Sequence, residues 1–100
     1  MDTTELRGQL DEEGRLLRYP TKYKKRLYAI LYLAEKLEPG RVYTEAEVNL
    51  TIGGWLAYND PAVWRRDLID HKLLERDRAG REYRRVDTLP SEEELIARWA

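Results

Sequence analysis

Three helix-start signals restrict the folds that this sequence can adopt. The segments TEAE at residues 44–47 and SEEE at residues 91–94 both match a capping box. In that motif the first side chain accepts from the third helical amide, and the glutamate reaches back to the first residue. Asp60 before Pro61 is a further start, because aspartate caps helices and proline is tolerated at the first helical position. We therefore expect helices that begin near residues 45, 61 and 92.

A longer helix is predicted upstream from the spacing of apolar residues. They recur every three or four positions at Tyr23, Leu27, Ile30, Leu31, Ala34 and Leu37, which is one stripe of an amphipathic helix. Thr21 is the expected N-cap, and Pro39-Gly40 should end the helix near Glu38. Short extended pieces are expected on either side, at residues 15–19 and 41–43.

A β-hairpin is predicted after the third helix. Residues 73–77 and 81–86 resemble two strands around RAGR, where Gly80 allows a tight turn. Before it, Trp64 and Leu68 are four apart and should face the core. Three helices followed by a hairpin are the layout of a winged helix-turn-helix. We therefore predict a mainly α fold with a small β-hairpin, arranged as a winged helix-turn-helix-like single domain.

The predicted domain spans residues 11–86. Residues 1–10 form an N-terminal extension without clear periodicity, and residues 87–100 form a C-terminal helix that packs on the domain. The 100 residues include no cysteine, which excludes disulfides, thiolate metal sites and cysteine nucleophiles. No apolar run approaches the roughly 18 residues of a membrane helix. The acidic N-terminal stretch does not resemble a signal peptide, so we expect a cytoplasmic protein that does not enter a membrane.

The net charge of −1 conceals a segregation of charge along the chain. Residues 1–14 hold five acids against one arginine, and residues 87–100 hold four acids against one arginine, giving −4 and −3. Residues 15–86 hold 16 basic and 10 acidic residues, giving +6. A basic body favours an anionic partner, although the acidic ends could instead neutralise it within one folded unit.

A series of motifs occurs in order along the chain: GRL at 14–16, Pro20, Lys22, KKR at 24–26, EPGR and YTEAEVN within 38–49, Asp60, Ala62, Arg65-Arg66, Leu68, Asp70, Leu74, Arg76 and Tyr83. Together these motifs resemble a bacterial family known as domain of unknown function 2087. The resemblance covers most of residues 11–86 and implies a winged-helix module associated with transcription control, with no established activity. The sequence departs from the family at Lys72, where a glycine often ends the third helix, and at Gly53-Gly54, in a region that is usually more helical. The tail at 89–100 lies outside the resemblance.

Basic residues are the candidate contacts to nucleic acid. The set comprises Arg65, Arg66, Arg76, Arg78, Arg81, Arg84, Arg85, Lys22, Lys24 and Lys25. Arg65 and Arg66 could contact DNA from the third helix, or they could pair with Asp67, Asp70 or another helix. The hairpin arginines could lie along the DNA backbone, or they could keep an edge strand from pairing with another chain. The lysines begin the first helix, at the end of the helix dipole that disfavours cations, so the acidic termini are alternative partners for them.

Other residue types argue for binding rather than catalysis. His71 is the only histidine and lies near a helix end, where favourable charge placement is the ordinary role. No nucleophile motif, ligand-spaced carboxylate cluster or phosphate-binding glycine loop is present, so we predict neither an enzyme nor a cofactor. Tyr28 and Tyr32 could form a homodimer surface, or the C-terminal helix could cover them through Trp99. We predict a DNA-binding, transcription-regulator-like module that acts weakly or as a dimer. The alternative is a protein-interaction module on the same fold.

Overall fold

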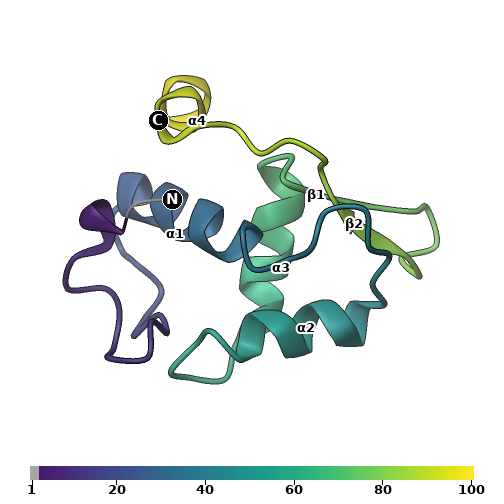
Figure 1. The fold of residues 1–100 in the computed structure, drawn as a ribbon, viewed down its shortest axis with the longest axis horizontal. Coiled ribbons are helices and arrows are strands. Elements are labelled where there is room, and N and C mark those ends of the chain that lie inside the picture. The colour runs from purple at the N-terminus through teal and green to yellow at the C-terminus, as the bar shows by residue number, and fades with distance from the viewer. Residues whose placement is uncertain (1–2) are drawn as a thin grey trace.

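Three helices and a two-stranded hairpin form the body of the protein, and a fourth helix packs on its side (Figure 1). The computed structural model describes residues 3–100. Its elements are the 3-10 turn η1 (Thr4–Leu6), α1 (Tyr23–Ala34), α2 (Glu45–Gly53), α3 (Pro61–Asp70), β1 (Leu74–Arg76), β2 (Tyr83–Arg85) and α4 (Glu92–Trp99). The predicted mainly α fold with a small β-hairpin in a single domain is confirmed, and the order of three helices followed by a hairpin is the one that the winged helix-turn-helix prediction requires. Residues 1 and 2 of the predicted extension lie outside the described residues.

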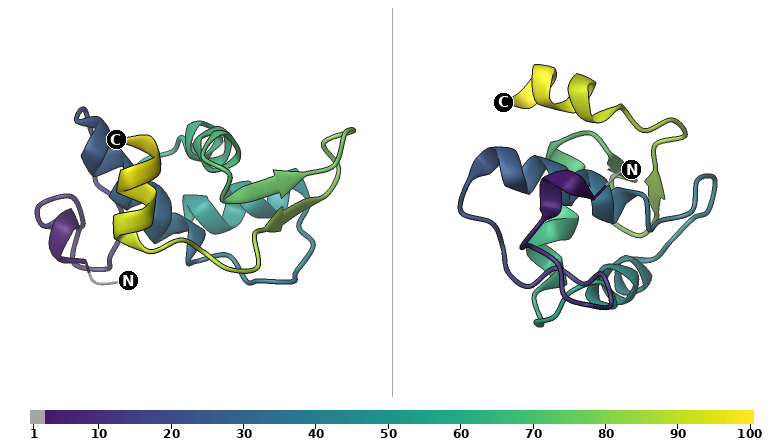
Figure 2. Two further views of the ribbon diagram at one scale, coloured as in Figure 1. Left: turned by 90° about the horizontal axis from the view of Figure 1, so that it is seen from above. Right: turned by 60° about the vertical axis from the view of Figure 1, so that its left-hand side comes forward.

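Helix α1 is the centre of the core. All residues from Leu27 to Ala34 are buried, whereas Tyr23 keeps 38% of its surface exposed. The predicted apolar stripe is buried from Leu27 to Leu37. Burial is not confined to that stripe, however, because η1, α3 and α4 all contact α1 (Figure 2) and enclose the helix on several sides. The predicted N-cap was wrong, because Lys22 occupies that position without a side-chain cap. The helix ends at Ala34, before the predicted Glu38.

The predicted helix starts agree with the structure, with one difference in mechanism. Thr44 Oγ1 accepts from the Glu47 amide at 3.1 Å, and Glu47 Oε1 accepts from the Thr44 amide at 2.8 Å. Ser91 and Glu94 form the same reciprocal pair at the start of α4. Asp60 is the N-cap residue of α3, but its side chain makes no capping hydrogen bond. Its predicted capping role was wrong, and Pro61 at the first position is what marks this start.

The hairpin joins β1 and β2 in antiparallel register, with Leu74 opposite Arg85 and Arg76 opposite Tyr83. Gly80 lies in its turn at φ +70°, a left-handed conformation that glycine adopts without strain. The extended piece predicted at residues 41–43 is a single bridge. The amides of Tyr43 and Tyr83 each donate to the other's carbonyl at 2.8 Å. The piece predicted at residues 15–19 is likewise reduced to bridges made by Leu16 to Leu10 and Leu56.

Helix α3 crosses the core through Trp64 and Leu68, which are both fully buried, as predicted. The indole N–H of Trp64 donates to the Tyr58 hydroxyl at 2.8 Å. The helix ends in a Schellman motif: the Lys72 amide donates to the Ile69 carbonyl, and the Leu73 amide donates to the Leu68 carbonyl. This geometry requires a left-handed residue, and Lys72 supplies it at φ +63°.

Helix α4 lies against α1, with Leu95 fully buried beneath it. The ring of Trp99 packs edge-on against His71, with centroids 4.8 Å apart. The ring partner of Trp99 is therefore His71, and not Tyr28 or Tyr32, which the sequence had suggested. Tyr28 and Tyr32 are nevertheless only 8% and 6% exposed, and Tyr32 donates to the Gly14 carbonyl at 2.6 Å. Both tyrosines are buried within one copy of the chain, so they do not offer a dimer surface.

Within residues 3–100, no helix has both the length and the apolar character needed to cross a bilayer.

Candidate nucleic-acid interface

The predicted basic residues separate into two regions of the molecule. Those of the hairpin lie at one end of the long axis and those of α3 lie near its middle, whereas the start of α1, with Lys22 and Lys24, lies toward the other end beside η1 (Figures 1 and 2). Lys22 and Lys24 are both exposed. The structure therefore does not bring the ten predicted residues onto one contact surface. The larger group of them lies on α3 and the hairpin.

Arg65 is held by helix α2 and serves the fold. Its Nη2 lies 3.3 Å from Glu45 Oε1, and its Nη1 donates to Asn49 Oδ1 at 2.6 Å. The Arg65 side chain is only 14% exposed, whereas that of Glu45 is 51% exposed. Of the two readings left open by the sequence, pairing with another helix is the one observed. Glu45 and Asn49 are four residues apart on α2, a spacing that places both on one helical side facing α3.

Arg66 is the arginine of α3 that remains available. It is exposed, and its Nε donates a long hydrogen bond of 3.5 Å to the Ala62 carbonyl of its own helix. Arg66 and Arg76 line the same open pocket of about 350 Å³, together with Arg65, Glu45, Asp70, Ile69 and Tyr83. The pocket lies at the junction of α2, α3 and the hairpin, so the hairpin extends the exposed side of α3.

The hairpin turn presents Arg78 and Arg81 to solvent. The turn is fixed from within by Asp77, whose Oδ1 accepts from the amides of Arg81 and Glu82 at 2.7 and 3.1 Å. The hydrogen bond from the Glu82 amide is the main cause that lowers the pKa of Asp77. The carboxylate is therefore directed toward the backbone of the turn, which leaves both arginine side chains without an ion pair among the described residues.

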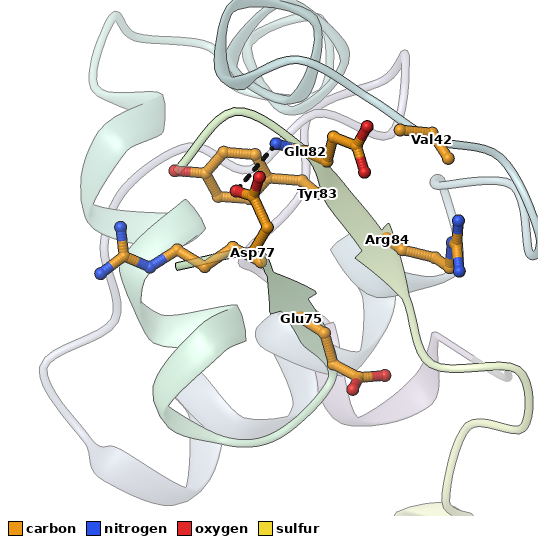
Figure 3. Close-up of a pocket in the computed structure, with 7 residues that line it drawn as sticks. Val42, Glu75, Asp77, Glu82, Tyr83 and Arg84 are labelled. Atoms are coloured by element: carbon orange, nitrogen blue, oxygen red, sulfur yellow. Dashed lines mark hydrogen bonds between the residues drawn. The ribbon is translucent and has the colours of Figure 1, made fainter. Parts of the chain in front are cut away.

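The outer face of the hairpin carries Arg84 (Figure 3). Arg84 is exposed and stands directly opposite Glu75 in the register of the two strands. Both residues line an open pocket of about 200 Å³ with Val42, Arg76, Asp77, Glu82 and Tyr83. Opposite charges across a strand pair stabilise the sheet modestly, and here no contact between them is short enough to be an ion pair. Arg84 therefore adds to the exposed cations of this end.

Two predicted residues, Arg85 and Lys25, are engaged in the fold. Arg85 donates to three backbone carbonyls, those of Val86, Leu37 and Asp87, at 3.0, 3.2 and 3.1 Å. It therefore ties the end of β2 to the segment that follows α1. Lys25 Nζ donates to the Glu5 carbonyl at 2.8 Å and lies 3.8 Å from the Glu5 carboxylate. An acidic partner from the N-terminal segment was one of the readings that the sequence allowed for the lysines.

Asp67 and His71 have partners that the sequence did not reveal. Asp67 Oδ2 accepts from the Tyr19 hydroxyl at 2.7 Å, so this aspartate belongs to the fold rather than to the outer side of α3. Burial, followed by that hydrogen bond, raises the pKa of Tyr19. His71 is buried at the end of α3; its Nδ1–H donates to the Asp67 carbonyl, and its Nε2 accepts from the Tyr23 hydroxyl, both at 2.7 Å. Residues 3–100 contain no group of three potential metal ligands.

Comparison with known proteins gives one match. A family model described as "Uncharacterized protein conserved in bacteria (DUF2087)" matches residues 15–85. The match begins just before Leu16 and ends at Arg85, and so includes α1 to β2 but neither η1 nor α4. No curated protein and no solved structure shows a significant match to the chain.

Proposed function

We propose that this chain, which belongs to the DUF2087 family of bacterial proteins, is a DNA-binding module of the kind found in transcription regulators. Its contact with double-stranded DNA is made by the exposed side of α3 and by the hairpin. The observation that carries the proposal is the set of exposed arginines gathered there. They are Arg66, Arg76, Arg78, Arg81 and Arg84.

The local balance of charge supports an anionic partner. Residues 74–85 contain five arginines and three acidic residues, a net charge of +2. One of the acids, Asp77, is directed into the turn by hydrogen bonds from two amides. The exposed arginines have no ion pair within residues 3–100, so binding a phosphate does not require an internal partner to be displaced. Arginine also binds phosphate through two parallel N–H donors, which adds geometry to charge.

The number of available arginines implies weak binding by one copy. Sequence-independent contacts of this kind give dissociation constants of roughly 10⁻⁴ to 10⁻⁶ M at physiological salt. A second copy on the same duplex would multiply the contacts, so tight binding would require a dimer. The surface for such a dimer is not Tyr28 or Tyr32, since both are buried in the monomer.

The test is the salt dependence of binding to a duplex of mixed sequence, measured by fluorescence anisotropy. Five phosphate contacts, one for each exposed arginine, predict a slope of about −4.5 in log K against log salt, or on the order of 500-fold between about 50 and 200 mM salt. The variant R78E/R81E should bind with a much shallower slope. The variant K22E/K24E changes the net charge by the same −4, but at the other end of the molecule, and should keep the slope of the native chain.

Equal effects of the two variants would mean that net charge, rather than the hairpin, attracts the DNA. No binding at low salt would refute the proposal. Circular dichroism of both variants is the control for folding, because all four substituted side chains are exposed.

A protein-interaction module on the same fold is the second candidate. One observation favours it: Leu50, on the outer side of α2, is 79% exposed. Val42 and Leu17, at 44% and 38%, are the next most exposed aliphatic side chains among the described residues. Solution scattering or sedimentation of the native chain and of L50E tests this candidate. A protein that is monomeric in both forms and binds DNA equally well in both would exclude Leu50 as part of a self-association surface.

A further inference from the structure

We infer that this chain recognises the phosphate backbone of duplex DNA and does not read the base sequence. The inference rests on the proposed function and specifies its partner. It follows from the residues that α3 and the hairpin place at the surface, considered against the chemistry that base reading requires.

The first turn of α3 lacks side chains that can hydrogen-bond to base edges. In helix-turn-helix proteins these contacts come mainly from the N-terminal residues of the second helix of the motif. Here they are Pro61, Ala62 and Val63, each partly buried. Arginine, lysine, asparagine and glutamine are the side chains that pair with guanine or adenine in the major groove, and none of them occurs in this turn. The capping position before it holds Asp60, whose negative charge is repelled by phosphates.

The second turn of α3 supplies one candidate reader, Arg66, in an unfavourable setting. Arg65 beside it is occupied by Glu45 and Asn49. Arg66 already donates from Nε to the Ala62 carbonyl. Asp70 lies one turn further along and lines the same pocket, so a carboxylate stands next to the only exposed guanidinium of the helix. A bidentate pairing with guanine through Nε would have to compete with the Ala62 carbonyl, whereas a single phosphate contact from Nη1 or Nη2 would not.

The hairpin favours a duplex over a single strand. Proteins that bind single strands without sequence preference stack the bases on exposed aromatic rings. On α3 and around the hairpin the aromatic residues are Trp64, Tyr43 and Tyr83, which are 0%, 2% and 3% exposed and form part of the core. The exposed cations of the hairpin instead occupy the end of β1, the turn and the outer face of β2. Exposed arginines of this kind suit contacts to backbone phosphates, and those contacts position a protein without reading sequence.

The experiment compares three probes at one low salt concentration. They are an A·T-rich duplex, a G·C-rich duplex of equal length, and one isolated strand of the second. The native chain should bind both duplexes with affinities within about threefold, because one lost base contact costs about 1–3 kcal/mol, or roughly 5- to 150-fold. It should bind the isolated strand several-fold more weakly than the duplexes.

Two single substitutions test the role of Arg66 directly. R66A should weaken binding to both duplexes by the same factor, as the loss of a phosphate contact would. K24A removes one exposed positive charge at the opposite end and should leave both affinities unchanged. A tenfold preference between the duplexes that R66A abolishes would overturn the inference while leaving the proposed function intact. Equal or tighter binding of the single strand would also overturn it, and no binding to any probe would refute the proposed function itself.

Discussion

Replacing Lys72 with glycine should stabilise the fold by removing backbone strain. Comparison of the glycine variant with an alanine variant measures that strain. Lys72 has φ +63° at the position after the cap of α3, where the Schellman motif demands a left-handed backbone. A side chain with a Cβ atom costs about 1–2 kcal/mol in that conformation. Glycine avoids this cost, but it loses about 0.4–1 kcal/mol through the greater entropy of the unfolded chain.

The expected difference between K72G and K72A is therefore about 1 kcal/mol in favour of glycine. Alanine retains the Cβ atom and the strain, and both variants lose the favourable charge that a lysine places near a helix C-terminus. Lys72 is exposed and its side chain makes no hydrogen bond or ion pair within residues 3–100, so neither variant removes a polar tertiary contact. For a domain of this size, 1 kcal/mol corresponds to a shift in Tm of about 4–8 °C.

The assay is urea unfolding and thermal unfolding followed by circular dichroism. The matched pair is L50A and L50G, at a site in the middle of α2 where the side chain is 79% exposed. There glycine should be the less stable by about 1 kcal/mol, because ordinary helical geometry favours alanine. The same Ala/Gly comparison thus has opposite signs at positions 50 and 72. If K72A proves as stable as K72G, the left-handed geometry at the end of α3 does not carry the assigned strain.

Two further predictions concern the core and the helix caps. Trp64 is fully buried and bonded to Tyr58, so W64A should cost about 3–5 kcal/mol in urea unfolding; a loss below 1 kcal/mol would mean that α3 is oriented differently. Hydrogen bonds from the Thr44 and Ser91 amides lower the pKa of Glu47 and Glu94 from the ordinary value of 4.5. The unfolded chain therefore binds more protons near and below that pH, so this stabilisation is present above about pH 4.5 and is lost as the pH falls through the lowered values. Between pH 5 and pH 3, the free energy of unfolding should fall less steeply in E47Q/E94Q than in the native chain, and parallel profiles would contradict this assignment.

The features that the sequence predicted correctly are those whose partners lie close together along the chain. Both capping boxes join residues three apart, and the hairpin pairs segments across a short turn. These signals depend on local backbone chemistry, so they hold whatever packs around them. Thr21 is an exception, because the chain enters α1 one residue later and Lys22 takes the capping position without a side-chain bond.

The roles of individual charged residues could not be predicted in the same way. Arg85 donates to the Leu37 carbonyl and Tyr19 donates to Asp67, and both pairs are 48 residues apart in sequence. An arginine on a strand gives no local sign that it is bonded to a distant carbonyl. The same holds for α1, whose spacing predicted one buried stripe although three other elements surround it. Tertiary contacts determine the role of each charged residue, whereas the sequence pattern indicates only which residues could bind a partner.

The Tyr43–Tyr83 bridge determines how the hairpin would behave when it meets a partner. Two backbone hydrogen bonds join the hairpin to the segment before α2, and the Tyr43 hydroxyl accepts from the Glu38 amide at 2.8 Å. The hairpin is thereby anchored on both of its strands: β1 follows directly from α3, and β2 is held by Tyr43. The hairpin backbone is already ordered when the protein folds, so DNA binding would order little beyond the arginine side chains. Binding would therefore cost little additional conformational entropy. In hydrogen exchange, the Tyr43 and Tyr83 amides should open only with the whole domain, and slow exchange there would distinguish a preformed contact surface from an arm that becomes ordered on DNA.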